Sequence, residues 1–329
     1  MCSPTVLILG AAGRFGAAAV AAFAAAGWRV LAQQRRAPKS PLPRGAVFID
    51  TPMHDSAALA ARAADATVVV YAVNPLYHRW DSELQPLFEQ GLAVAERLGA
   101  RFLLPGNVYN YGAGMPPLLR EDTPAMPSTR KGEQRVAMET TLQQRAARGL
   151  DSSVIRAGDF FGAGSGSWFD QAVVKHIARG KLVYPGPPGL AHAWAYLPDL
   201  ARAFVAVAAS PRVRGVQTLH FAGHTCTGHE FLAAVDEAAQ TLGLRPAAGF
   251  RHGGMPWGLI RVVGLVHPIW RELARMSYLW RVPHGLDGRA LERAVGQLPT
   301  TPLVQAVRQS MLDLGLGQAD VATAQVAGM

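Results

Sequence analysis

Residues 6–16, VLILGAAGRFG, carry three glycines at intervals of three, Gly10, Gly13 and Gly16. The apolar run before them is typical of a buried strand, and the alanine-rich run after them is typical of a helix that ends at Gly27. Glycine permits a tight turn and lets a pyrophosphate approach the backbone, where amides of the helix N-terminus bind it. The stretch therefore predicts a dinucleotide-binding strand, turn and helix, with a tight turn lacking any ligand as the alternative.

The end of the second strand, WRVLA at 28–32, indicates which dinucleotide is bound. A site for NAD has an acidic residue there to hold the ribose hydroxyls. No acidic residue occurs between the glycine loop and Asp50, and Arg35 and Arg36 follow the strand instead. Guanidinium groups suit a 2′-phosphate, and Arg14 in the loop can join them. We therefore expect NADP (NADPH) in preference to NAD; a solvated basic loop is the alternative.

Apolar strands and helices alternate through the first half of the chain. The predicted strands continue at 46–50, 66–73, 101–106 and 151–158, with helices at 56–64 and 82–98. This alternation predicts an α/β fold with a Rossmann-type, doubly wound parallel sheet. Ligands of such sheets bind at the carboxyl ends of the strands.

The same patterns suggest how the chain is divided. We expect an NAD(P)-binding Rossmann domain over 1–160, to which 192–222 returns, and a smaller, mainly helical, C-terminal substrate lobe over 161–191 and 223–316. Residues 317–329 are weakly patterned and are expected to be a flexible tail. The aromatic run at 256–283 is more typical of helical core than of a sugar platform.

Charge and composition exclude several classes of protein. The chain has 329 residues, a net charge of +9 and a sequence pI near 10.1. Almost all of the positive charge is arginine scattered along the chain, so we expect no nucleic-acid partner. Residues 5–27 are about long enough to span a bilayer, but their order of residue types favours the strand and helix above, and we expect no membrane partner. Cys2 and Cys226 have no metal-binding spacing, so we expect no metal site and a cytoplasmic protein.

A second unusual stretch, PSTRKGEQRVAMET at 127–140, reads as the start of a helix with Pro127 and Ser128 as entry and cap. Arg130, Lys131 and Arg135 occupy its first two turns against a single Glu133. Cations there oppose the helix dipole by roughly 0.3–1 kcal/mol each. We expect an anion to offset them, and a Rossmann-type sheet would place the cofactor nearby.

Further motifs give these features a family resemblance. They are NVYNYG at 107–112, VIRAGDFFGAG at 154–164 and AWAYLPDLARAFVAV at 193–207. With the glycine loop and Asp50, they resemble the extended, atypical short-chain dehydrogenases/reductases of the NAD(P)-dependent epimerase/dehydratase family, clearly over residues 4–210. The resemblance implies an enzyme, an oxidoreductase or epimerase, acting on a carbonyl or hydroxyl substrate, with nucleotide sugars among the candidates.

The family's Ser-Tyr-Lys set is altered in this chain. Counting back from Glu139, its positions fall on Asn107, Lys131 and Arg135. In one hypothesis Lys131 exchanges the proton and Asn107 binds the reacting carbonyl. In a second, the chain is a non-catalytic, redox-responsive regulator that binds NADP(H). In a third, it is an isomerase or dehydratase with Tyr109 as the proton donor.

The predicted site residues form three groups. The catalytic candidates are Asn107, Tyr109, Lys131 and Arg135. The cofactor-binding candidates are Gly10, Gly13, Arg14, Phe15, Gly16, Arg35, Arg36, Asp50, Ala72, Asn74 and Arg135. The substrate-binding candidates are Tyr109, Trp168 and Phe169. Arg156 and His192 are read as structural, the partner is a small-molecule substrate, and substrate identity and oligomeric state, a homodimer included, stay open.

Overall fold

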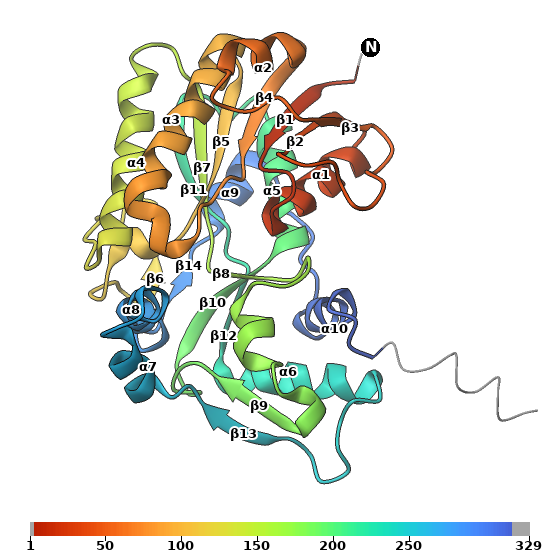
Figure 1. Ribbon diagram of the computed structural model, residues 1–329, viewed down its shortest axis with the longest axis vertical. Helices are drawn as coiled ribbons and strands as arrows, with labels where there is room; N and C mark the ends of the chain where they lie inside the picture. The colour runs from red at the N-terminus through yellow and green to blue at the C-terminus, as the bar shows by residue number, and fades with distance from the viewer. Residues whose placement is uncertain (1–2, 318–329) are drawn as a thin grey trace, which may run out of the picture.

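The computed structural model describes residues 3–317 and centres on a parallel sheet of seven strands, in the order β11-β7-β5-β4-β1-β2-β3 (Figure 1). The strands are β1 (Thr5–Leu9), β2 (Arg29–Gln33), β3 (Ala46–Ile49), β4 (Ala66–Tyr71), β5 (Arg101–Gly106), β7 (Ser152–Arg156) and β11 (Val216–His220). The chain order reverses at β1, which pairs with both β2 and β4. The predicted Rossmann-type, doubly wound sheet is confirmed.

Helices cover both faces of this sheet (Figure 1). One layer holds α1 (Arg14–Ala25), α5 (Leu197–Ala209) and α9 (Arg289–Val295), and the other holds α2 (Ser56–Arg62), α3 (Trp80–Leu98) and α4 (Arg130–Ala146). Alternation along β1 explains the two layers: Val6 and Ile8 pack in the core of the first, whereas Leu7 and Leu9 pack in the core of the second.

Below the large sheet lies a lobe of helices and small sheets (Figure 1). Its strands are β8 (Asp159–Phe161), β10 (Ala191–Tyr196) and β12 (His224–Thr227) in one sheet, β9 (Lys181–Tyr184) with β13 (Arg251–Gly254), and β6 (Leu118–Leu119) with β14 (Gly285–Leu286). Its helices are α6 (Gly228–Thr241), α7 (Trp257–Gly264), α8 (Pro268–Arg275) and α10 (Leu303–Asp313). A separate core that includes Phe161, Trp194 and Phe231 holds the lobe together.

Short turns complete the chain: η1 (Tyr77–Arg79), η2 (Tyr109–Tyr111), η3 (Phe169–Val173), η4 (Ile177–Arg179) and η5 (Met276–Trp280). Residues 192–222 begin in β10 of the lobe and return to the large sheet through α5 and β11. The proposed domain boundaries remain predictions. The expected tail at 317–329 lies, after Gly317, outside the described residues.

The cap of α4 differs from the prediction. Thr129, not Ser128, is the capping residue, and its hydroxyl accepts a hydrogen bond from the Gly132 amide at 3.3 Å. Ser128 instead accepts one from the Ala113 amide, 3.0 Å away, and so fastens the preceding loop. Ser and Thr cap helices about equally well, so tertiary contacts decide between them.

No helix within residues 3–317 is long and apolar enough to cross a membrane. Nor does that range contain a group of three or more His, Cys, Asp or Glu side chains placed to hold a metal ion.

Candidate active site

The glycine loop joins β1 to α1 at the carboxyl edge of the large sheet. Gly10 has a φ of +81°, and a Cβ on Gly16 would lie 2.3 Å from the Gly10 carbonyl oxygen, so the turn itself requires both glycines. Gly13 is the N-cap of α1, with no side-chain cap and no acidic residue in the first turn. The first amides of α1 therefore lack a side-chain partner, which suits a phosphate.

The two side chains that follow Gly13 point in different directions, Phe15 into the core and Arg14 toward the lobe. The Phe15 ring packs edge-on against Phe204 with centroids 4.7 Å apart, so only its backbone can face a ligand. Arg14 reaches across to the lobe, where it donates a long hydrogen bond of 3.5 Å to the Gly162 carbonyl oxygen. Burial lowers the pKa of Arg14, which the carboxylates of Asp170 and Asp159 partly offset.

The end of β2 presents the two predicted arginines to solvent. Arg35 and Arg36 are exposed, and neither forms an ion pair within residues 3–317. The Gln34 side chain donates to the Arg36 carbonyl oxygen at 2.8 Å and fixes the loop that carries them. Asp50, at the end of β3, forms an exposed ion pair with Arg62 at 3.0 Å.

Arg135 lies at the ends of β4 and β5, on the first turns of α4. Its guanidinium donates only long hydrogen bonds, 3.4 Å to the Pro105 carbonyl oxygen and 3.5 Å to the Asn74 side chain. Its Nε is buried without a hydrogen-bond partner, and burial lowers the pKa of the group. Ala72, at the end of β4, is half-buried beside the glycine loop. An unpaired guanidinium in this position is suited to an anion.

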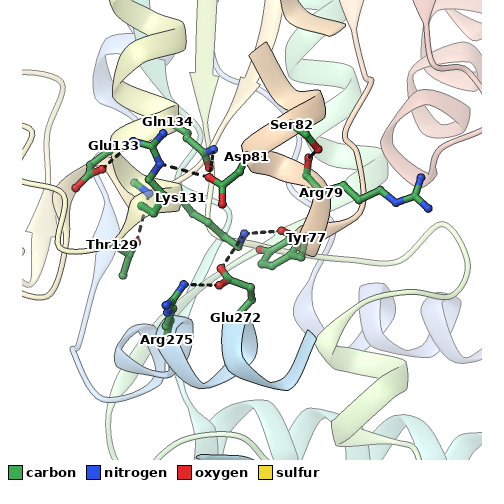
Figure 2. A network of polar contacts seen from close by, with 12 residues as sticks. Tyr77, Arg79, Asp81, Ser82, Thr129, Lys131, Glu133, Gln134, Glu272 and Arg275 are labelled. Carbon is green, nitrogen blue, oxygen red and sulfur yellow. Dashed lines mark hydrogen bonds and ion pairs between the residues drawn. The ribbon is translucent and has the colours of Figure 1, made fainter. Parts of the chain in front are cut away.

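Lys131 is one turn earlier and is paired within the protein. It is 4% exposed, its Nζ lies 3.0 Å from the Glu272 carboxylate, and it donates to the Tyr77 carbonyl oxygen at 2.6 Å (Figure 2). The same Nζ lies 4.9 Å from the ring centroids of Tyr77 and Trp80. The ammonium group of Lys131 is therefore held by groups of the protein itself, the Glu272 carboxylate and the Tyr77 carbonyl oxygen.

Protein carboxylates therefore offset two of the three cations that open α4. Arg130 is exposed and pairs with Asp81 and with Glu133, each at 3.3 Å. Lys131 forms an ion pair with Glu272 of α8, a residue distant in the sequence. Arg135 has no carboxylate within 4.0 Å among the residues that the structure describes, so it is the cation that an external anion would pair with.

Two tyrosines meet beside Lys131. The hydroxyl groups of Tyr77 and Tyr109 are hydrogen-bonded to each other. Burial raises the pKa of Tyr77 to about 12 and that of Tyr109 well above its usual range, and the nearby Asp159 carboxylate adds to both shifts. Asn107 accepts a hydrogen bond from the Tyr109 amide at 3.0 Å and so holds η2 in place.

The lobe side of the site is aromatic. Trp168 is half-buried and packs edge-on against Trp280, with centroids 5.2 Å apart. The predicted substrate contact Phe169 is 1% exposed and belongs to the lobe core, so its side chain offers no surface to a substrate. Trp280 stacks in parallel on His192 at 4.1 Å.

The two residues read as structural are buried and paired. His192 hydrogen-bonds Asp159 across 2.9 Å, and Arg156 forms an ion pair with Glu139 of α4. Arg156 also donates to the Tyr111 hydroxyl group. The first contact joins β10 to β8 within the lobe, and the contacts of Arg156 join β7 to α4 and to η2.

Sequence reasoning missed Tyr77, Asp159 and Glu272 as members of the site. Asp159 could have been identified from the sequence, because it follows a predicted strand within the motif VIRAGDFFGAG at 154–164. Glu272 has a weaker signal in the sequence, as the only acidic residue between Glu237 and Asp287. The sequence around Tyr77 contains no pattern that indicates a place in the site.

The sequence matches the model of the NAD dependent epimerase/dehydratase family over residues 6–219. No curated protein shows significant similarity to the chain.

Solved structures share the fold at low identity. L-threonine dehydrogenase from Clostridium difficile is 15% identical, with a TM-score of 0.73 over 96% of this chain and 98% of that one. UDP-N-acetylglucosamine 4-epimerase from Bacillus cereus is 12% identical, with a TM-score of 0.72 over 94% and 99%. The enzyme WbmH from Bordetella bronchiseptica, solved with NAD+, is 18% identical, with a TM-score of 0.71 over 95% and 98%.

Proposed function

The chain belongs to the NAD dependent epimerase/dehydratase family of enzymes, and we propose that it uses NADP(H) to act on a hydroxyl or carbonyl group of a small molecule. One observation carries the proposal: three groups without anionic partners line the same edge of the sheet. They are the first amides of α1, the exposed Arg35 and Arg36, and the guanidinium of Arg135. When bound, the cofactor supplies hydride transfer.

Each group has a proposed part in holding the cofactor. The α1 amides would bind the pyrophosphate, and Arg35 with Arg36 would bind a 2′-phosphate. Arg135 would contact the ribose or phosphate on the nicotinamide side, near Asn74. Asp50 keeps the adenine-side position that the family resemblance implies, although its carboxylate is shared with Arg62.

The proton is proposed to pass through the Tyr77–Tyr109 pair. A phenol is neutral at physiological pH and burial raises the pKa of both tyrosines further, so each carries a proton that it can donate. Lys131 is held by Glu272 and the Tyr77 carbonyl oxygen, and it acts as a positioning cation. Among the three hypotheses, the contacts therefore favour a tyrosine as the proton donor over Lys131.

We propose that Asn107 positions the carbonyl group of the substrate and takes no part in proton transfer. Its Oδ1 accepts from the Tyr109 amide, which leaves the Nδ2 to donate to a carbonyl oxygen. For the substrate, the solved relatives include an epimerase of a UDP-sugar. A nucleotide sugar is accordingly the first compound class to test.

A non-catalytic NADP(H)-binding regulator is the second candidate. The observation that favours it is Lys131 at the position of the family's tyrosine, locked in an ion pair with Glu272. Such a protein would bind the cofactor at the same edge without passing a proton.

Ligand identification and turnover together test the proposal. The purified chain is analysed by mass spectrometry for co-purified ligands and assayed with NADPH against carbonyl compounds, UDP-sugars included. Tyr109→Phe and Tyr77→Phe should lower kcat by about 10²–10⁴-fold while the Kd for NADPH stays within a few-fold. Binding without turnover across the panel would favour the regulator, and failure to bind NADPH or NADH would refute both candidates.

A further inference from the structure

The helices α7 and α8 form a hairpin, residues 257–275, at the periphery of the lobe (Figure 1). Its two helices pack closely because Gly264 has no side chain: a Cβ there would lie 3.0 Å from the Arg271 Cα. Arg271 also donates to the carbonyl oxygens of Gly264 and Leu265, at 3.0 and 2.9 Å. The connecting turn is thereby fixed in shape.

The outward face of this hairpin is apolar. Ten large hydrophobic side chains are exposed within residues 3–317, and six of them lie here. They are Leu259, Val262, Leu265, Val266, Ile269 and Trp270, with Val266 at the tip 84% exposed. Inward contacts are made by other residues, since Ile260 is fully buried and Trp257 packs against Trp168. The six exposed side chains therefore do not belong to the core of the lobe, and an exposed apolar face of this kind is typical of an interaction surface.

The charges on the hairpin are nearly all positive. Exposed arginines flank the apolar face at Arg261, Arg271 and Arg275. Glu272 is its only acidic residue; its side chain is 16% exposed and pairs with Lys131 and with Arg275 (Figure 2), which leaves Arg261 and Arg271 without a carboxylate partner within residues 3–317. The surface thus combines apolar side chains and a tryptophan with arginines, without an outward carboxylate.

We propose that the hairpin docks peripherally on a bilayer that contains anionic lipids. Leu265 and Val266 at the tip would enter the acyl boundary, Trp270 would lie at the interface, and the arginines would contact the headgroups. A second copy of the chain fits less well, because a two-fold contact would bring the arginines of both hairpins together. The expectation of no membrane partner concerned a spanning segment at 5–27, and this proposal revises it for a peripheral contact.

Docking would place α8, and the residues that it contacts, beside the bilayer. Glu272 joins α8 to Lys131, and Lys131 in turn donates to the carbonyl oxygen of Tyr77 in η1. The inference concerns the surface alone and does not rest on the proposed function.

Vesicle flotation with the purified full chain tests the proposal. The vesicles are phosphatidylcholine alone, or phosphatidylcholine with about one third phosphatidylglycerol, a content that gives a negative surface potential. The expected result is binding to the anionic vesicles that weakens as salt is added. Leu265→Ser/Val266→Ser should reduce the bound fraction at least tenfold, and Arg261→Glu should reduce it several-fold.

Matched controls are Val47→Ser on β3, whose side chain is 50% exposed, and Arg212→Glu, an exposed arginine outside the hairpin. Both should bind as the wild type does, and melting temperatures confirm that each variant folds. Absence of wild-type binding to anionic vesicles, or equal binding by the Leu265→Ser/Val266→Ser variant, would overturn the proposal. A wild-type dimer in light scattering that this variant converts to monomer would also overturn it, in favour of a protein interface.

Discussion

Lys131 shows how one buried side chain constrains the chemistry of the site. A buried ammonium needs a partner, and Glu272 lies 3.0 Å from it with both side chains largely covered, 5% and 16% exposed. The Glu272 carboxylate pairs with Lys131, and the hydrogen bond to the Tyr77 carbonyl oxygen fixes the lysine beside η1. We therefore propose that Lys131, at the position to which the family resemblance assigns a catalytic tyrosine, is a structural cation.

Replacing one member of this pair should destabilise the protein more than replacing both. Lys131→Met leaves Glu272 with only the exposed Arg275 as a cationic partner and should lower the free energy of unfolding by about 1–3 kcal/mol. Lys131→Met/Glu272→Leu should recover part of the loss. Urea denaturation measures both. Arg130→Met is the control, since its ion pairs are exposed, and it should leave stability unchanged. A double variant no more stable than the single one would contradict the coupling.

His220 should make stability depend on pH. Burial, reinforced by the Arg156 charge, lowers its pKa from 6.5 to about 4. Because the folded pKa lies below the unfolded one, the neutral imidazole stabilises the fold above pH 6.5 and this contribution is lost as the pH falls toward 4.

By this linkage the loss for His220 is about 2 kcal/mol between pH 7 and pH 5. His220→Gln should flatten the pH dependence of the melting temperature over that range, whereas the exposed His252→Gln should not. His284, buried with a pKa also lowered to about 4, should keep part of the dependence in both variants. An unchanged slope in His220→Gln would show that His220 does not titrate as described.

At the scale of elements, the glycine loop and the helix behind it were predictable because their determinants are local. Strand, turn and helix follow one another in sequence, and positive φ at Gly10 and close contact at Gly16 select glycine directly. The arginines that follow β2 are also apparent in the sequence, whereas the preference for NADP inferred from them stays a prediction. The link between Tyr77 and Tyr109, the partner of Lys131, and the choice of Thr129 over Ser128 as cap depend on segments distant in the chain, and no local pattern encodes them.

Two glycines of the loop should respond differently to substitution. A Cβ on Gly13 would lie 3.3 Å from the Gly10 carbonyl oxygen and 3.8 Å from that of Ala72, a tight but tolerable fit. Gly13→Val should therefore fold, as circular dichroism would show, and lose dinucleotide binding because its side chain fills the space before α1. Gly16→Ala should lose the fold itself, since its Cβ would be 2.3 Å from the Gly10 oxygen. A folded Gly13→Val variant that binds NADPH normally would show that the loop is only a turn.

At the scale of the whole molecule, the arginines differ in whether a carboxylate of the protein pairs with them. The net charge of +9 includes arginines at the end of β2, at the start of α4 and on the hairpin 257–275. Composition alone indicated only that nucleic acid was an unsuitable partner. The structure separates these arginines into ones paired with carboxylates, such as Arg130 and Arg275, and ones without a carboxylate partner within residues 3–317, such as Arg35 and Arg135.

The central claim is that the edge of the sheet binds NADP(H) through unpaired arginines. The most direct test is a titration of the wild type and of Arg35→Ala/Arg36→Ala with NADPH and with NADH. A charge-assisted contact contributes about 1.5–3 kcal/mol, so the wild type should bind NADPH at least about tenfold more tightly than NADH, and the variant should bind both alike. Equal affinities in the wild type, or binding of neither cofactor, would contradict the claim.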